Sequence, residues 1–264
     1  MSDFKHAKRV VVKVGTSTLT HGTGLINIRR LEKLVKVLAD IANSGAELAI
    51  VSSGAIAVGV GKLGLRERPR ENALRQAAAA VGQCELMYLY DQCFSRFNHT
   101  VAQLLLTRDV VDEPLRRENV TNTFTQLFAL GAIPIINEND TVSIDELEGD
   151  SFGDNDALSA LVATLIGADA LIILSDIDGL FTQNPQEDPN AALIGLVEEI
   201  DDQIVGYATG AKSNRGTGGM ATKIQAARIA TNAGIPVAII NGQDPENLYT
   251  LIEGGQVGTI FKAR

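Results

Sequence analysis

Apolar residues along the chain follow two patterns, short continuous runs and longer stretches with helical spacing. The runs, such as Val10-Val11-Val12, are typical of strands that are buried on both faces of a sheet. We expect strands at residues 10–14, 47–52, 101–106, 133–136, 170–174, 237–240 and 259–261. We expect helices at residues 28–43, 72–97, 116–130, 157–166 and 220–233. Because the two alternate, the pattern predicts an α/β fold with a mainly parallel central sheet covered by helices on both faces.

A lysine stands near the end of the first strand. Lys13 follows three valines and is succeeded by Val14, Gly15 and Thr16. A lysine in such a place is costly to desolvate unless an anion lies opposite it, and Gly15 can let a ligand approach the main chain. We therefore interpret this corner as a holder of a phosphoryl group, which indicates a small-molecule kinase. The alternative is a lysine that reaches solvent beside an ordinary turn.

A second phosphate candidate lies near the carboxyl end of the chain. Residues 216–223 read Gly-Thr-Gly-Gly-Met-Ala-Thr-Lys and open a helix. Glycines before a helix leave amide N–H groups free, and the helix dipole favours an anion there. Lys223 lies one turn into the helix, where it can reach terminal phosphates. The segment is not a Walker A loop, and the alternative is a linker followed by a helix.

Two polar segments lie at the junctions of other elements. Residues 137–140, Asn-Glu-Asn-Asp, follow a strand and either form a turn or hold the amino group of a zwitterionic substrate. Residues 154–156, Asp-Asn-Asp, precede an apolar helix. Asp154 or Asn155 can cap that helix, and the cluster can also orient two lysines or help to hold a magnesium–nucleotide. Because open α/β sheets bind ligands beyond the carboxyl ends of their strands, these loops can converge on one cleft.

Composition excludes several other classes. The chain has 264 residues, 45% of them apolar, and a net charge of −9, which argues against nucleic acid or a membrane surface as a partner. Its histidines and two cysteines lack zinc-binding spacing, so we assign no residue as a metal ligand. No run of transmembrane length and no signal peptide occur, which predicts a cytoplasmic protein. Residues 59–64 match G-x-G-x-x-G formally, but they lie too far past the strand for a dinucleotide site.

Taken together, these segments resemble the glutamate 5-kinase family of the amino-acid kinase superfamily. The resemblance rests on residues 13–17, 53–57, 137–140, 153–156 and 216–223, and it extends in order along nearly the whole chain. It implies a three-layer sandwich, with a single domain over residues 1–264. It further implies a glutamate-binding lobe at 1–168 and an ATP-binding lobe at 169–264. The implied reaction is ATP-dependent phosphorylation of the γ-carboxylate of L-glutamate, the first step of proline synthesis.

The resemblance also implies roles for single residues. Lys13 and Lys223 would stabilise the transferred phosphoryl group, and Asp156 would organise them. Residues expected to bind glutamate are Ser53, Gly54, Asn137, Asp140 and Asn155. Residues expected to line the ATP site are Lys13, Gly15, Ser175, Asp176, Thr217, Gly218, Gly219, Met220, Ala221, Thr222 and Lys223. Gly15 and Gly54 would supply amide donors near the phosphates, and Mg²⁺ would accompany ATP.

The chain departs from many bacterial members of the family in one respect. Those members continue into a PUA domain, whereas this sequence stops at Arg264, so we expect a short form without that domain. The family implies a homo-oligomer, a dimer or a tetramer, with proline as a feedback inhibitor and a glutamyl-phosphate reductase as a partner. Two alternatives stay open. The acceptor can be another carboxylate, a carbamate or a phosphate monoester, and the protein can be a non-catalytic amino-acid sensor.

Overall fold

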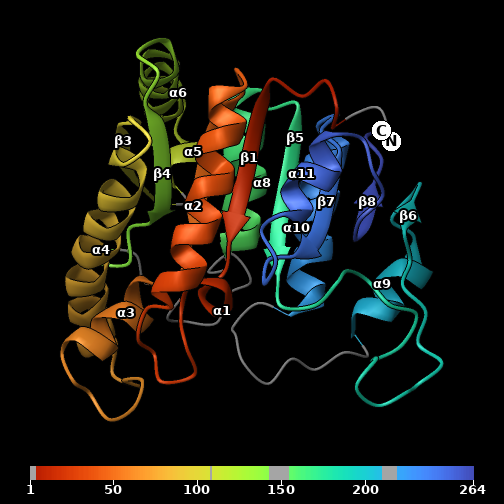
Figure 1. The fold of residues 1–264 in the computed structure, drawn as a ribbon, viewed down its shortest axis with the longest axis horizontal. Helices are drawn as coiled ribbons and strands as arrows, with labels where there is room; N and C mark the ends of the chain where they lie inside the picture. Colours follow the sequence, from red (N-terminus) through yellow and green to blue (C-terminus); the bar gives the residue numbers. More distant parts are fainter. Residues whose placement is uncertain (1–3, 108, 143–154, 210–218) are drawn as a thin grey trace.

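The computed structural model describes residues 4–107, 109–142, 155–209 and 219–264. Its centre is one eight-stranded sheet with the order β3-β4-β2-β1-β5-β7-β8-β6 (Figure 1). The strands are β1 (Arg9–Val14), β2 (Glu47–Ser52), β3 (Val101–Leu106), β4 (Ile133–Glu138), β5 (Ala170–Ser175), β6 (Leu196–Val197), β7 (Val237–Asn241) and β8 (Thr259–Phe261). All neighbours pair in parallel except β7 and β8, which are antiparallel. The predicted mainly parallel sheet is therefore confirmed.

Helices cover both faces of this sheet. They are α1 (Thr16–Leu19), α2 (Ile28–Asn43), α3 (Ala55–Lys62), α4 (Asn72–Ser95), α5 (Asp109–Asp112), α6 (Pro114–Ala129), α8 (Asn155–Ile166), α9 (Asp202–Thr209), α10 (Met220–Asn232) and α11 (Asn247–Ile252). In Figure 1, α2 and α11 lie in front of the sheet, and α8 and α10 lie behind it. The predicted three-layer sandwich is confirmed by this arrangement.

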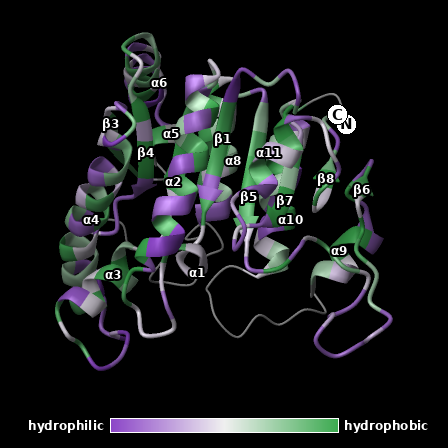
Figure 2. Ribbon diagram, viewed as in Figure 1, coloured by the Kyte–Doolittle hydropathy of each residue, from purple (hydrophilic) through white to green (hydrophobic). Residues whose placement is uncertain are grey.

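The two sides of β1 face two different cores. Val10, Val12 and Val14 pack in the core that includes α2, α4 and α11, whereas Val11 packs in the core that includes α8 and α10. Side chains of a strand alternate between the faces of a sheet. Lys13 therefore lies on the face of Val11 and meets α8 and α10. Figure 2 shows the central strands mostly hydrophobic and the loops at their carboxyl ends largely hydrophilic.

Several sequence expectations hold to within a few residues. The helix expected at 28–43 is α2, and the side chain of Asn27 caps it by accepting a hydrogen bond from the Arg30 amide at 3.1 Å. The sequence analysis does not predict the short helices α1, α5, α9 and α11. They are too short to show a clear helical period, and four residues such as Thr16–Leu19 form a helix only when the surrounding fold holds them.

The formal G-x-G-x-x-G segment lies mostly within α3, where Gly59 permits close packing of two helices. A Cβ atom at Gly59 would overlap the carbonyl oxygen of Ala78 on α4, and one at Gly82 would overlap the carbonyl oxygen of Ala55 on α3. Small residues at these two positions let the helix backbones touch. The motif therefore has a packing role.

The two halves of the chain contribute the two halves of the sheet. Residues before 169 form β3-β4-β2-β1, and residues after 168 form β5-β7-β8-β6. The halves join through the parallel pairing of β1 with β5. No helix among the described residues has the length and apolar character needed to cross a membrane.

Candidate active site

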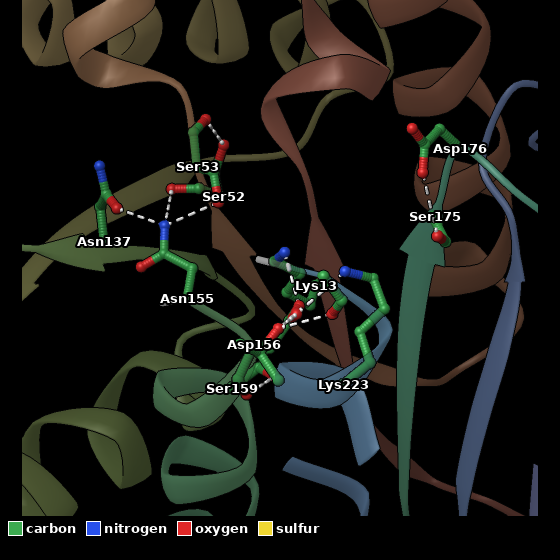
Figure 3. A network of polar contacts seen from close by, with 12 residues as sticks. Lys13, Ser52, Ser53, Asn137, Asn155, Asp156, Ser159, Ser175, Asp176 and Lys223 are labelled. Atoms are coloured by element: carbon green, nitrogen blue, oxygen red, sulfur yellow. Dashed lines mark hydrogen bonds and ion pairs between the residues drawn. The ribbon is translucent and has the colours of Figure 1, made fainter. Parts of the chain in front are cut away.

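Two lysines from distant parts of the sequence contact the same carboxylate. Lys13 Nζ lies 2.6 Å from Asp156 Oδ1, and Lys223 Nζ lies 3.0 Å from Asp156 Oδ2 (Figure 3). The Asp156 side chain is fully buried, and those of Lys13 and Lys223 are 6% and 9% exposed. Lys13 comes from the end of β1, Asp156 from the first turn of α8 and Lys223 from the first turn of α10. The three predicted catalytic residues are thus brought together.

The two ammonium groups keep Asp156 ionised. Burial alone would raise the pKa of this carboxyl group, because it disfavours the charged form. The charges and hydrogen bonds of Lys13 and Lys223 outweigh burial and lower the pKa of Asp156 to about 2. Thr222 Oγ1 donates a further hydrogen bond of 2.9 Å to Asp156 Oδ2. Together, the two lysines and Asp156 carry one net positive charge, which suits a polyanionic ligand.

Asn155 connects side chains that are expected to bind glutamate, the acceptor of the phosphoryl group. We call Asn155, Ser53 and Asn137 the acceptor cluster. Its Nδ2 donates to Ser53 Oγ at 2.8 Å, to Asn137 Oδ1 at 2.9 Å and, more weakly, to the Ser52 carbonyl oxygen at 3.3 Å. Ser53 and Asn155 are half-buried, whereas Asn137 is 2% exposed. Asn137 therefore supports the other two from inside the protein. Figure 3 shows this cluster beside the lysine pair.

Helix α4 anchors the end of β2 and the loop that follows it. Ser52 Oγ lies 3.0 Å from the hydroxyl oxygen of Tyr90, and both residues are fully buried. Burial raises the pKa of the Tyr90 phenol, which keeps the hydroxyl protonated. Gly54 follows in a left-handed conformation (φ 107°) that a residue with a side chain rarely adopts, and α3 begins directly after it. The loop thus presents Ser53 in a fixed position.

Asp140 lies two residues beyond the end of β4. The preceding residue, Asn139, donates its amide hydrogen to the Leu106 carbonyl oxygen at 2.8 Å, which fixes the turn against β3. Asp140 is half-buried and follows the strand that carries Asn137. Its carboxylate is therefore at the same edge of the sheet as the Asn155 cluster.

The expectation for Gly15 needs correction. Gly15 has φ −80° and ψ 159°, an extended conformation that any residue can adopt. A Cβ atom there would meet its nearest neighbours, including Lys13 Nζ, at 3.8 Å, which is ordinary van der Waals contact. The sequence argument from glycine's conformational freedom is thus wrong at this position. A methyl group would therefore fit beside the Lys13 ammonium group, and the position does not require glycine.

The start of α10 carries the glycine-rich candidate segment in part. Thr217 and Gly218 lie outside the described residues. Gly219 occupies the N-cap position and has no side chain with which to cap the first amide groups of α10. Ala221 is exposed and Thr222 is half-buried, whereas the Met220 side chain is buried in the core.

Ser175 and Asp176 lie at the carboxyl end of β5, next to β1. Ser175 is buried, Asp176 is exposed, and Ser175 Oγ lies 3.4 Å from Asp176 Oδ1. The loop after β7 lies alongside, because the Gly242 amide donates to the Ser175 carbonyl oxygen at 2.8 Å. These residues lie at the edge of the half of the sheet that residues after 168 form.

The sequence analysis missed Gln83 and Tyr90, which support the acceptor cluster from α4. Gln83 Oε1 accepts a hydrogen bond of 2.9 Å from Asn137 Nδ2. A polar residue at a buried helical position was the available signal for Gln83, but its partner on β4 is visible only in the fold.

A metal ion must be considered because kinases use metal–nucleotide complexes. Within the described ranges, no group of three or more His, Cys, Asp or Glu side chains is arranged to hold a metal ion. Both oxygens of Asp156 face ammonium groups, which leaves this carboxylate poorly suited as a metal ligand.

Comparison with known proteins places these features in a family. The model of the amino acid kinase family matches residues 8–241. "Glutamate 5-kinase" of Clostridium perfringens (strain 13 / Type A) is 52% identical over 262 residues, 99% of this chain and 97% of that protein. "Glutamate 5-kinase" of Listeria innocua is 49% identical over 262 residues, 99% and 95% of the two chains. The UMP kinase of Bacillus anthracis, a solved structure, superposes with a TM-score of 0.65 at 19% identity over 97% of this chain and 96% of that one, which supports the fold alone. The chain therefore belongs to the amino acid kinase family and, within it, to the glutamate 5-kinases.

Proposed function

We propose that the protein transfers the γ-phosphoryl group of ATP to the γ-carboxylate of L-glutamate. The observation that carries this proposal is the pair of buried ammonium groups, Lys13 and Lys223, on opposite oxygens of Asp156. Phosphoryl transfer requires positioning and positive charge more than covalent chemistry from the protein. The extensive identity to proteins named glutamate 5-kinase supports glutamate as the acceptor.

The proposed reaction needs no general base. An oxygen of the ionised γ-carboxylate attacks the γ-phosphorus of ATP and forms a new P–O bond. The bond from that phosphorus to the β–γ bridging oxygen breaks, and its electron pair leaves with ADP. Lys13 and Lys223 stabilise the charge that develops on the phosphoryl and bridging oxygens. Asp156 is a positioning residue that holds both ammonium groups in place.

The acceptor binds, in this proposal, at the edge formed by the first half of the chain. Ser53 and the amide of Gly54 hold the γ-carboxylate of glutamate. Asp140 holds the ammonium group of the substrate. Asn155, held by Asn137, contributes its Oδ1 as an acceptor for the same ammonium group. Residues 1–168 thus form the glutamate-binding lobe, and the half-buried Ser53–Asn155 hydrogen bond supports this assignment.

ATP binds, in the same proposal, at the edge formed by residues 169–264. Phosphate oxygens meet Lys13, Lys223 and amides at the start of α10, and Ser175 and Asp176 line the nucleotide side. The phosphates also approach the main chain at Gly15, Gly219 and Ala221. The glycine-rich segment 216–223 further includes Thr217 and Gly218. Mg²⁺, which neutralises phosphate charge when bound, comes with the nucleotide and is held by phosphate oxygens.

Further properties follow from the reaction and the family. We propose a cytoplasmic location, where ATP is available, and a homo-oligomeric assembly, a dimer or a tetramer. The acyl phosphate product is labile, which favours a glutamyl-phosphate reductase as the next enzyme. Proline is the expected feedback inhibitor. Size measurement in solution tests the homo-oligomeric assembly, and inhibition by added proline tests the feedback.

An acceptor panel tests the proposed function. The purified chain is incubated with ATP and Mg²⁺, and ADP release is measured with L-glutamate, L-aspartate, N-acetylglutamate, carbamate and uridine monophosphate. We expect ADP release to depend on L-glutamate above the others. A preference for a phosphate monoester or a carbamate would contradict the proposal, and so would glutamate binding without ADP release, which would indicate a sensor.

A further inference from the structure

A buried chain of side-chain amides leads from helix α4 to the acceptor cluster. Asn137 Nδ2 donates to Gln83 Oε1 at 2.9 Å, and Asn155 Nδ2 donates to Asn137 Oδ1 at 2.9 Å. Asn155 Nδ2 also donates to Ser53 Oγ at 2.8 Å. Gln83 and Asn137 are 7% and 2% exposed, so solvent cannot substitute for these contacts. The chain therefore runs from the core to the half-buried edge of the site, whose outer end Figure 3 shows.

One backbone group fixes the orientation of every amide in this chain. The Glu138 amide donates to Asn137 Oδ1 at 2.9 Å, and a backbone N–H can only donate. Asn137 must therefore turn its oxygen toward Glu138 and its nitrogen toward Gln83. Since Asn137 Oδ1 also faces Asn155, Asn155 must turn its nitrogen inward. Its own Oδ1 is left on the other side of the amide group.

Gln83 is the innermost residue of this series of hydrogen-bonded side-chain amides. Its Oε1 is the acceptor that Asn137 Nδ2 requires, while its Nε2 is buried and has no hydrogen-bond partner among the described residues. A buried donor without a partner is costly and seldom retained where an apolar residue would fit. The neighbouring Gly82 allows α4 to approach α3 closely, which brings Gln83 within reach of β4.

We propose that Gln83 is a positioning residue for the acceptor site. It holds Asn137, which in turn orients Asn155 and Ser53 toward the amino-acid substrate. The inference rests on the proposed function, because it assigns Gln83 to glutamate and not to ATP. Gln83 itself does not touch the reacting atoms, and the lysine pair lies on the opposite face of the sheet.

The test compares Gln83→Met with Gln92→Met, a matched change at an exposed position of the same helix. Loss of one hydrogen-bond partner at a buried site predicts a KM for glutamate raised about tenfold in Gln83→Met. We expect the KM for ATP to change less than twofold and Gln92→Met to match the unmodified chain. Equal KM values for glutamate in both variants, or equal increases for glutamate and ATP, would overturn the proposal.

A double variant separates positioning from general packing. If Gln83 acts through Asn137, adding Gln83→Met to Asn137→Ala changes the KM for glutamate less than twofold. Additive effects of the two substitutions would contradict the proposal. If Gln83→Met does not fold, Gln83→Glu keeps the acceptor for Asn137 Nδ2, and we expect its KM for glutamate within threefold of the unmodified chain. A tenfold increase in the KM of Gln83→Glu for glutamate would also contradict the proposal. If the unmodified chain shows no glutamate-dependent ADP release, the proposed function fails first, and this inference with it.

Discussion

The ammonium group of Lys13 lies 2.6 Å from the Asp156 carboxylate, and both side chains are almost completely buried. A buried ion pair contributes little net stability, because desolvation offsets much of its attraction. Lys223 adds a second buried cation to the same carboxylate. This arrangement suits a site that must bind and stabilise negative charge, which is the requirement of phosphoryl transfer.

Replacement of Lys13 should remove catalysis selectively. Lys13→Ala is expected to lower kcat by about 10²–10³, the cost of losing one preorganised donor to transition-state charge. Steady-state ADP release measures the effect. The control is Lys36→Ala, an exposed lysine on α2, which should keep the unmodified rate. Turnover by Lys13→Ala at the unmodified rate would remove this residue from the reaction.

Replacement of Lys223 should affect both turnover and nucleotide affinity. Lys223 lies at the start of α10, where the amide groups and the lysine would together hold the terminal phosphates. Lys223→Ala is expected to lower kcat and to weaken ATP binding about tenfold or more, measured by calorimetric titration. An ATP dissociation constant equal to that of the unmodified chain would place Lys223 outside the nucleotide site.

Asp156 should contribute stability that depends on pH in a defined window. Its folded-state pKa of about 2 lies below the ordinary value of 3.8. The stabilisation is therefore complete above about pH 5 and is lost as the pH falls toward 2. It amounts to about 2 kcal/mol for this pKa difference.

Asp156→Asn tests this contribution. The variant leaves two buried ammonium groups without their carboxylate. Its free energy of unfolding at pH 7 should therefore be about 3–5 kcal/mol lower than that of the unmodified chain. Urea unfolding should show the deficit shrinking between pH 5 and pH 2. The control Asp91→Asn, at an exposed position of α4, should change the unfolding free energy by less than about 0.5 kcal/mol. A deficit that is the same at every pH would show that Asp156 is protonated or unpaired in the folded state.

The contact between α3 and α4 should depend on glycine. Gly59→Ala places a methyl group on the Ala78 carbonyl and should reduce the free energy of unfolding by about 2 kcal/mol or more. Gly206→Ala is the control, because Gly206 lies in α9 and no atom of the described part of the chain outside the backbone of that helix lies within 4 Å of its Cβ position. It should be neutral or stabilise the protein by up to about 1 kcal/mol. Equal stability of the two variants in urea unfolding would contradict the packing role.

Sequence reasoning succeeded where one local pattern determines the structure. The apolar period of residues 28–43 and the Asn27 cap define α2 to the residue, and the valine run defines β1. Lys13 and Lys223 were identified because lysines at element ends beside glycines are chemically conspicuous, whereas the resemblance to the glutamate 5-kinases singled out Asp156 among residues 154–156. That they meet at one carboxylate follows from the strand alternation and the order of the sheet.

The parts that sequence reasoning missed depend on contacts between distant elements. Gln83 reads as one polar residue in a long helix until Asn137 of β4 is placed beside it. The sequence analysis rejects the formal motif that includes Gly59, but its packing role becomes visible only when Ala78 is placed against it. Gly15 was singled out for a conformation that it does not adopt. Such features depend on the register between helices and strands, which no single segment encodes.

The most direct test of the central claim is trapping of an acyl phosphate by hydroxylamine. The unmodified chain and the double variant Lys13→Ala/Lys223→Ala are each incubated with L-glutamate, ATP and Mg²⁺, and glutamyl hydroxamate is quantified. The account predicts hydroxamate from the unmodified chain and a loss of at least about 10³-fold in the double variant. Absence of hydroxamate from the unmodified chain, or equal amounts from both proteins, would contradict it.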